Sequence, residues 1–188
     1  MKRSYASAAT SKLTREPYAD QATVGLGRLR AMLRPATQAD LGALIELARQ
    51  PEIARTLAWD AADTLAAALE AGSGELLVVE IDGAFAGGVR WQVTNRRSRI
   101  VEIRTLMLDP AVQRRGLALA TVHELVERLF EHHGMHRIEA EVMGINDAAR
   151  SVFERAGFVH EGTRRRAYDR HGAWQDGVRY GLLPEDRV

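Results

Sequence analysis

The feature that most constrains the fold is a strand–helix–strand run in the middle of the chain. Residues 100–108 predict a strand that ends at Asp109-Pro110. An apolar stripe at helical spacing follows, made of Ala118, Val122, Leu125, Val126 and Leu129. Residues 137–142 then alternate between polar and apolar side chains, which predicts a second strand. Two strands of one sheet joined by a helix must run parallel through a right-handed crossover.

The segments on either side of this crossover predict antiparallel strands. Before it we expect a strand at 31–35, a helix capped by Thr37 and ended by Pro51, a helix at 61–71, and strands at 75–81 and 84–94. Asp82-Gly83 favours a type I′ hairpin between the last two. After it we expect a short helix capped by Asn146, then strands at 158–166 and 178–183 joined by a polar loop around 169–175. The predicted fold class is α/β, with a mixed, mostly antiparallel sheet and a central parallel β-α-β crossover.

The domain organisation follows from where this pattern begins. Residues 1–30 show no sustained periodicity, so we expect a flexible N-terminal tail followed by a single domain over residues 31–188. The first fifteen residues are rich in Ser, Ala, Lys and Arg and lack acids, which leaves a transit peptide as the alternative.

Charge and composition exclude several classes of function. A formal net charge of +1 disfavours a nucleic-acid-binding protein, which normally shows a strong basic excess. No apolar run approaches the roughly 18 residues that a membrane span needs. The chain has no cysteine and no His-Glu-x-x-His run, so we expect no metal site and a reducing, cytoplasmic environment.

The segment from Gln113 to Ala118 carries the strongest chemical signal. It joins the strand that ends at Leu108 to the long helix, where backbone N–H groups have no partner inside the helix. Those groups and the helix dipole favour an anion, and Gly116 allows close approach of a phosphate. The Gly-Lys-Ser/Thr ending of a nucleoside triphosphate loop is absent. A plain strand-to-helix turn is the alternative interpretation of this segment alone.

In its context the segment resembles the cofactor motif of the GNAT acetyltransferases. The match runs from Glu102 to Ala118, and a second block, Asn146 to Phe158, is similar to the Asn-helix-Gly-Phe block of that family. The resemblance implies a GNAT-like fold and acetyl-CoA as co-substrate. It also implies cofactor contacts from the strand, the loop and the second block: Met107, Leu108, Gln113, Arg114, Arg115, Gly116, Leu117, Ala118, Leu119, Asn146 and Phe153. Capping of the helix alone is the alternative role for Asn146.

The resemblance implies an N-acetyltransferase that acts on a primary amine, either a protein N-terminus or a small molecule. Residues 161–163 with Tyr168, Gly172 and Asp176 resemble the branch that acetylates ribosomal-protein N-termini, more weakly. The alternative is a non-catalytic acyl-CoA-binding or sensing module on the same fold. The sequence leaves open a homodimer, and it does not name the acceptor.

Glu102 is the candidate general base, since it lies on the strand expected to line the cleft. The alternative is an ion pair with Arg104, which would lower the pKa of Glu102. The usual proton donors of the family are absent, because Phe153 and Ala149 occupy the positions of its Tyr and Ser. Four side chains are candidate replacements, and the sequence does not choose among them: Ser151, His160, Tyr168 and Tyr180. Unassisted departure of the thiolate is a further alternative, since its pKa is about 8.5.

Overall fold

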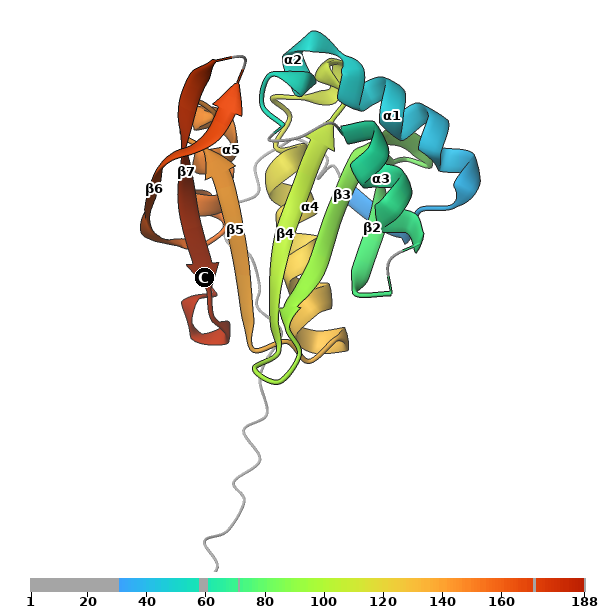
Figure 1. The fold of residues 1–188 in the computed structure, drawn as a ribbon. Coiled ribbons are helices and arrows are strands. Elements are labelled where there is room, and N and C mark those ends of the chain that lie inside the picture. Colours follow the sequence, from blue (N-terminus) through green and yellow to red (C-terminus); the bar gives the residue numbers. More distant parts are fainter. Residues whose placement is uncertain (1–30, 58–60, 71, 171, 188) are drawn as a thin grey trace, which may run out of the picture.

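A seven-stranded sheet organises the molecule (Figure 1). The computed structural model describes residues 31–57, 61–70, 72–170 and 172–187. The strands are β1 (Ala31–Pro35), β2 (Gly74–Ile81), β3 (Ala84–Asn95), β4 (Ile100–Leu108), β5 (Arg137–Met143), β6 (Val159–Arg170) and β7 (Ala173–Leu182). The α-helices are α1 (Leu41–Arg49), α2 (Pro51–Ala54), α3 (Ala61–Glu70), α4 (Leu117–Glu127) and α5 (Asp147–Arg155). The predicted tail, residues 1–30, lies outside the described residues.

The strand order is β1-β2-β3-β4-β5-β7-β6. β4 and β5 pair in parallel on either side of α4, and every other pairing is antiparallel. This confirms the predicted fold class. No helix in the described segments is long and apolar enough to cross a membrane.

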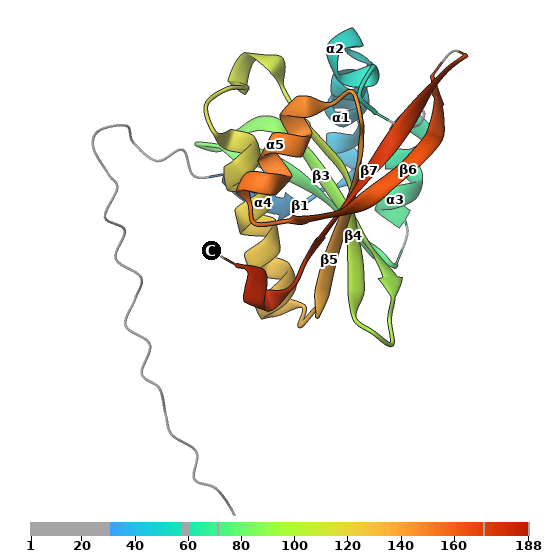
Figure 2. The ribbon, with the colours of Figure 1, turned by 90° about the vertical axis from the view of Figure 1, so that its left-hand side faces the viewer.

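Helices cover both faces of the sheet and divide the core in two (Figure 2). On one face, α4 and α5 bury Leu125, Leu129 and Phe153 against the strands. On the other, α1, α2 and α3 bury Leu44 and Leu65 against β2 and β4. The second group of helices covers the β1–β4 part of its face, so the face over β5, β7 and β6 is open (Figure 1).

Three local signals in the sequence have the structural effect expected of them. Thr37 and Asp40 form a capping box, which begins a 3-10 turn that runs into α1. Asp82 and Gly83 have φ values of 50° and 79°, as a type I′ turn requires. Asn146 Oδ1 accepts the N–H of Ala149 at 3.1 Å and caps α5.

The structure adds two details to the predicted elements and corrects one of them. Pro51 does end α1, but it also occupies the first turn of the short helix α2, where its missing N–H costs nothing. The end of the long helix, Arg128–His132, is a π-helical turn. The segment 169–175, predicted as a loop, is largely strand, because β6 and β7 extend as a hairpin to Arg170 and Ala173.

Strand β4 contains a bulge at Arg104. Arg90 of β3 pairs with Thr105 and Trp91 pairs with Ile103, so Arg104 is an extra residue with no partner in register. Odd-numbered side chains of β4 face α4 before the bulge, and even-numbered ones do so after it. Before it, Ile103 packs against α4 and α5; after it, Leu106 and Leu108 do so.

Candidate functional site

The candidate site is a gap between β4 and β5. The parallel pairing of these strands ends at Ile103 and Ala140, although β4 continues to Leu108 and β5 to Met143. Figure 1 shows the two strands diverging beyond that point. Backbone groups of residues 104–108 that face β5 therefore form no hydrogen bonds with it.

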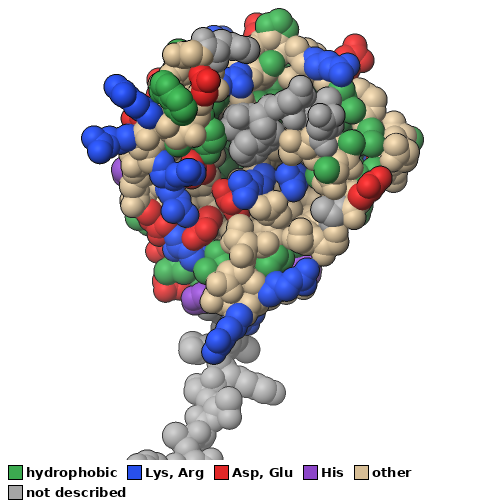
Figure 3. Space-filling model, viewed as in Figure 1, with side chains coloured by type: hydrophobic (Ala, Val, Ile, Leu, Met, Phe, Trp, Pro, Cys, Tyr) green, Lys and Arg blue, Asp and Glu red, His purple; other side chains and the backbone are tan. Residues whose placement is uncertain are grey.

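The gap is lined from both faces of the sheet. The α5 side contributes Val142, Asn146, Ala149 and Phe153. The opposite, open face contributes Thr56, Leu57, Arg104, Glu141 and Tyr168. The lining is thus mostly apolar towards α5 and polar at the open face. Figure 3 shows the open face, where basic and acidic side chains surround a hollow.

The loop before α4 lies at the diverging end of β4. Gly116 has φ of 79° and immediately precedes the helix, and Arg114 also has a positive φ, 63°. A Cβ atom built on Gly116 would meet nothing within 4 Å, so its backbone is open to a ligand. Arg114 and Arg115 are exposed beside it. The first N–H groups of α4 thus lie beside open space and next to two exposed cations in sequence, a combination that suits a phosphate.

The other residues predicted to contact a cofactor are distributed around this loop. Gln113 Nε2 donates to the Leu108 carbonyl at 2.8 Å, which ties the loop to the end of β4. Met107 and Leu117 are buried, so only their backbone groups are available. Ala118 and Leu119 are partly buried in the first turn of α4. Asn146 and Phe153 line the gap from α5.

Comparison with known proteins decides the family. The model of the family described as "Acetyltransferase (GNAT) domain" matches residues 30–159, which include the gap and the loop. The chain belongs to the GNAT acetyltransferase family.

Probable N-acetyltransferase YjcK of Bacillus subtilis is 35% identical over 79 residues, 42% of this chain and 44% of that protein. N-alpha-acetyltransferase RimI of Mycobacterium tuberculosis is 38% identical over 72 residues, 38% of this chain and 43% of that one. The chain thus spans less than half the length of either relative.

Solved structures extend the likeness of this GNAT domain over most of its length. Spermidine N-acetyltransferase from Vibrio cholerae, solved with CoA and spermine, aligns with a TM-score of 0.75 at 21% identity, covering 84% of this chain and 97% of that one. Mycobacterium smegmatis RimJ, solved with CoA-disulfide, aligns at 0.73 and 26% identity, covering 84% and 86%. The first establishes a shared fold.

Glu102 of the GNAT domain lies just inside the closed end of the gap. It pairs in register with Glu139, and the next pair, Ile103 with Ala140, is the last one before the strands separate. Glu102 is not itself among the residues that line the gap. Its carboxylate pairs with Arg104 Nε at 3.0 Å, so the ion pair considered in the sequence analysis is present. The expected lowering of the Glu102 pKa was nevertheless wrong. Burial raises it, and the nearby Glu141 and Glu139 charges add to the rise, against the opposing effect of Arg104.

Glu141 is a functional candidate that the sequence analysis missed. Its side chain is 9% exposed, and both of its oxygens accept from Arg164 Nη1, at 2.9 and 3.0 Å. Tyr168 donates to Glu141 Oε1 at 2.5 Å. Gly177 makes room for this carboxylate, because a Cβ there would lie 2.3 Å from Oε1. The available signal was the alternation of residues 137–142, which places Glu139 and Glu141 on the face of Glu102.

Among the four candidate proton donors, the structure brings Tyr168 to the gap. Burial, followed by its bond to Glu141, raises the pKa of the Tyr168 hydroxyl, so this phenol keeps its proton at neutral pH. Tyr180 is buried beneath α5 and donates to Glu154 at 2.9 Å. Ser151 and His160 are exposed and do not line the gap.

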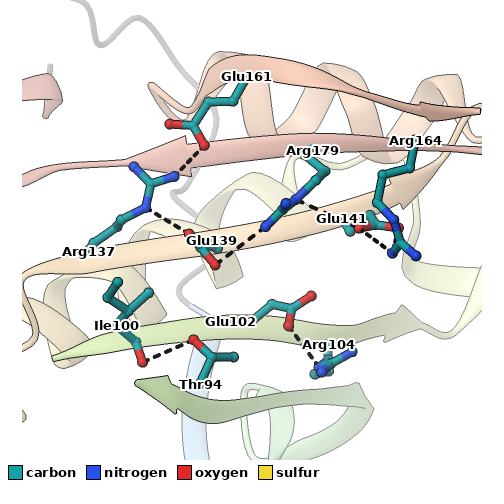
Figure 4. A network of polar contacts seen from close by, with 10 residues as sticks. All are labelled: Thr94, Ile100, Glu102, Arg104, Arg137, Glu139, Glu141, Glu161, Arg164 and Arg179. Atoms are coloured by element: carbon teal, nitrogen blue, oxygen red, sulfur yellow. Dashed lines mark hydrogen bonds and ion pairs between the residues drawn. The ribbon is translucent and has the colours of Figure 1, made fainter. Parts of the chain in front are cut away.

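An ion-pair network spreads from the gap across the open face (Figure 4). Arg137 pairs with Glu139 and Glu161, and Arg179 lies within 4 Å of both Glu139 and Glu141. Within the described segments, no group of three or more His, Cys, Asp or Glu side chains could hold a metal ion. The glutamates of this network, Glu139, Glu141 and Glu161, are each held in place by an arginine.

Proposed function

We propose that this protein transfers the acetyl group of acetyl-CoA to a primary amine, on a protein N-terminus or a small molecule. The observation that carries the proposal is the gap between β4 and β5, which is lined from both faces of the sheet. Two substrates can therefore meet within it, one from the α4–α5 face and one from the open face. Membership of the GNAT family supports acyl transfer as the chemistry.

The α4 side fits acetyl-CoA, which supplies the acetyl group when bound. Backbone N–H groups of residues 116–119 would hold its pyrophosphate, with Arg114 and Arg115 adding positive charge. The unpaired backbone edge of residues 104–108 offers hydrogen bonds to the amides of the pantetheine arm, with Asn146 and Phe153 opposite. Relatives of the same fold have been solved with CoA and with CoA-disulfide.

The open face supplies the acid–base groups. Glu102 would take a proton from the acceptor ammonium through a water molecule, and its raised pKa makes it a better base than an exposed glutamate. The freed amine forms the new C–N bond while the C–S bond breaks. Tyr168 would donate a hydrogen bond or a proton to the departing sulfur, and solvent is the alternative proton source.

The experiment is acetyl-CoA turnover, followed by release of the free CoA thiol. The acceptor panel contains peptide N-termini, polyamines and aminoglycosides, with acetyl-CoA alone as the blank. Release that depends on one class of amine, with the acetylated product confirmed by mass spectrometry, is the expected result. Tight acetyl-CoA binding without turnover on any amine would instead identify a sensing module.

A further inference from the structure

Arg90 is a partly buried cation on β3, on the same face of the sheet as Glu102 and one strand away from it. It pairs in register with Thr105, and Gln92, two residues further along the same face of β3, pairs with Glu102. Arg90 Nη2 donates to Gln92 Oε1 at 3.0 Å. Among the described residues no carboxylate lies within ion-pair distance of it. Its guanidinium therefore has one neutral side-chain partner.

This situation differs from that of four other arginines on the same face. Arg104 pairs with Glu102, and Arg137, Arg164 and Arg179 all lie within 4 Å of glutamates. Burial lowers the pKa of Arg90 and the Arg104 charge lowers it further, while the Glu102 charge acts in the opposite direction. A positive charge taken partly out of water without a carboxylate in ion-pair contact is costly, and an anionic ligand would offset that cost.

The position of Arg90 connects it to the acceptor side of the gap. Arg104, which lines the gap, lies next to Arg90 at the bulge of the neighbouring strand. Adjacent strands are about 4.8 Å apart, so a group bound by Arg90 would lie roughly 5–10 Å from an amine in the gap. A guanidinium binds a carboxylate through two parallel N–H bonds.

We propose that Arg90 binds a carboxylate of the acceptor, so that the substrate is an amine with an acidic group roughly 5–10 Å away. The proposal rests on the acetyl transfer proposed above. Two sources share this chemistry: the side chain of an acidic residue at the first or second position of a peptide, and the distal carboxylate of an amino acid such as glutamate. A polyamine carries only positive charge and would be repelled by Arg90.

The test compares acceptors that differ only in this group. Peptides with Glu or Gln at the second position form one arm, free glutamate and glutamine form the other, and spermidine is the cationic reference. For the wild-type protein we expect kcat/KM to be at least tenfold higher for the glutamate acceptor than for its glutamine counterpart. This difference should occur in the peptide pair if the substrate is a peptide, and in the free amino-acid pair if it is an amino acid. Arg90→Gln should reduce that ratio to about one, and Arg90→Lys should leave an intermediate ratio because it keeps the charge and loses the planar fork.

Arg97→Gln is the matched control, because it removes the same charge from an exposed position in the β3–β4 turn and should leave the ratio unchanged. A melting curve for each variant verifies folding, and Arg90→Lys keeps the test informative if Arg90→Gln does not fold. Equal turnover of carboxylate and amide acceptors by the wild type would overturn the proposal while leaving acetyl transfer intact. If no acceptor turns over, the proposed acetyl transfer is wrong. The role of Arg90 is then tested by measuring the binding of the same acceptor pairs in the presence of CoA. Equal affinities for the carboxylate and amide members would overturn the proposal for Arg90.

Discussion

Tyr168 and Glu141 meet at the open face of the gap, where the Tyr168 hydroxyl donates a 2.5 Å hydrogen bond to Glu141 Oε1. The carboxylate is fixed in turn by Arg164 and by the space above Gly177. A hydroxyl held in this way occupies a defined position and stays protonated at neutral pH. We therefore propose this hydroxyl as the group that donates a hydrogen bond to the leaving sulfur.

Replacing Tyr168 with Phe removes this hydroxyl and keeps the ring. We expect turnover to fall about 10- to 100-fold, at or below the low end of the effect of a general acid, because a thiolate can leave without one. Acetyl-CoA affinity, measured by calorimetry, should change little. Tyr180→Phe is the control, since its hydroxyl is buried against Glu154 outside the gap. If Tyr168→Phe lowers only the melting temperature, Tyr168 is structural and solvent supplies the proton.

Glu102→Gln tests the base. Turnover at pH 7 should fall roughly 100-fold, and the loss should shrink as pH rises because more of the amine is already deprotonated. Steady-state rates between pH 6 and 9 measure this. Near-normal turnover at pH 7 would show that Glu102 serves only its ion pair with Arg104.

The raised pKa of Glu102 also predicts how stability depends on pH. A carboxyl whose pKa is higher in the folded state binds its proton more tightly there, so it stabilises the fold at low pH. That contribution is complete below the pKa of the unfolded chain and is lost as pH rises through the folded value. The melting temperature of the wild type, relative to Glu102→Gln, should therefore fall as the pH rises above about 4. A difference that grows with pH would contradict the direction of the shift.

Gly116→Asp tests the loop before α4. An aspartate there would place a side chain and a negative charge in the space assigned to the pyrophosphate, so acetyl-CoA binding should weaken at least 100-fold by calorimetry. The left-handed backbone adds about 1 kcal/mol of strain. Gly83→Asp has the same φ of 79° and equally open surroundings in the β2–β3 turn, so it controls for that strain. Unchanged affinity in Gly116→Asp would remove the loop from the cofactor site.

A chain that begins at Ala31 should fold and bind acetyl-CoA. The periodic pattern starts there, and Ala31 already pairs with Ile81 as the first residue of β1. Circular dichroism melting and calorimetry on the truncated protein test this. Loss of folding or of binding would place part of residues 1–30 within the domain or in a contact between subunits.

The sequence was sufficient for the elements whose signals are local. Asp82-Gly83 predicts its turn because few residues tolerate two positive φ values, and Asn146 predicts its cap because the helix needs an acceptor there. The crossover from β4 to β5 follows from a helix between two strands. The resemblance added the prediction that the loop before α4 and the helix after Asn146 contact the cofactor.

The features that the sequence did not predict depend on contacts between distant segments. Glu141 becomes a candidate only when the parallel register places β5 beside β4 and the β6–β7 hairpin brings Arg164 and Tyr168 over it. The sign of the Glu102 pKa shift depends on burial and on two carboxylates from β5, which outweigh the sequence neighbour Arg104. The bulge at Arg104 has no residue signature, since no glycine marks it.

The bulge also limits how the length of β4 can change. Deleting one residue between Glu102 and Leu106 would make the strand regular and leave Leu106 and Leu108 on the α4 face. Deleting a residue from a regular part of the strand would instead move one end of it to the opposite face. The bulge is therefore where β4 can lose a residue without exchanging the two halves of the core.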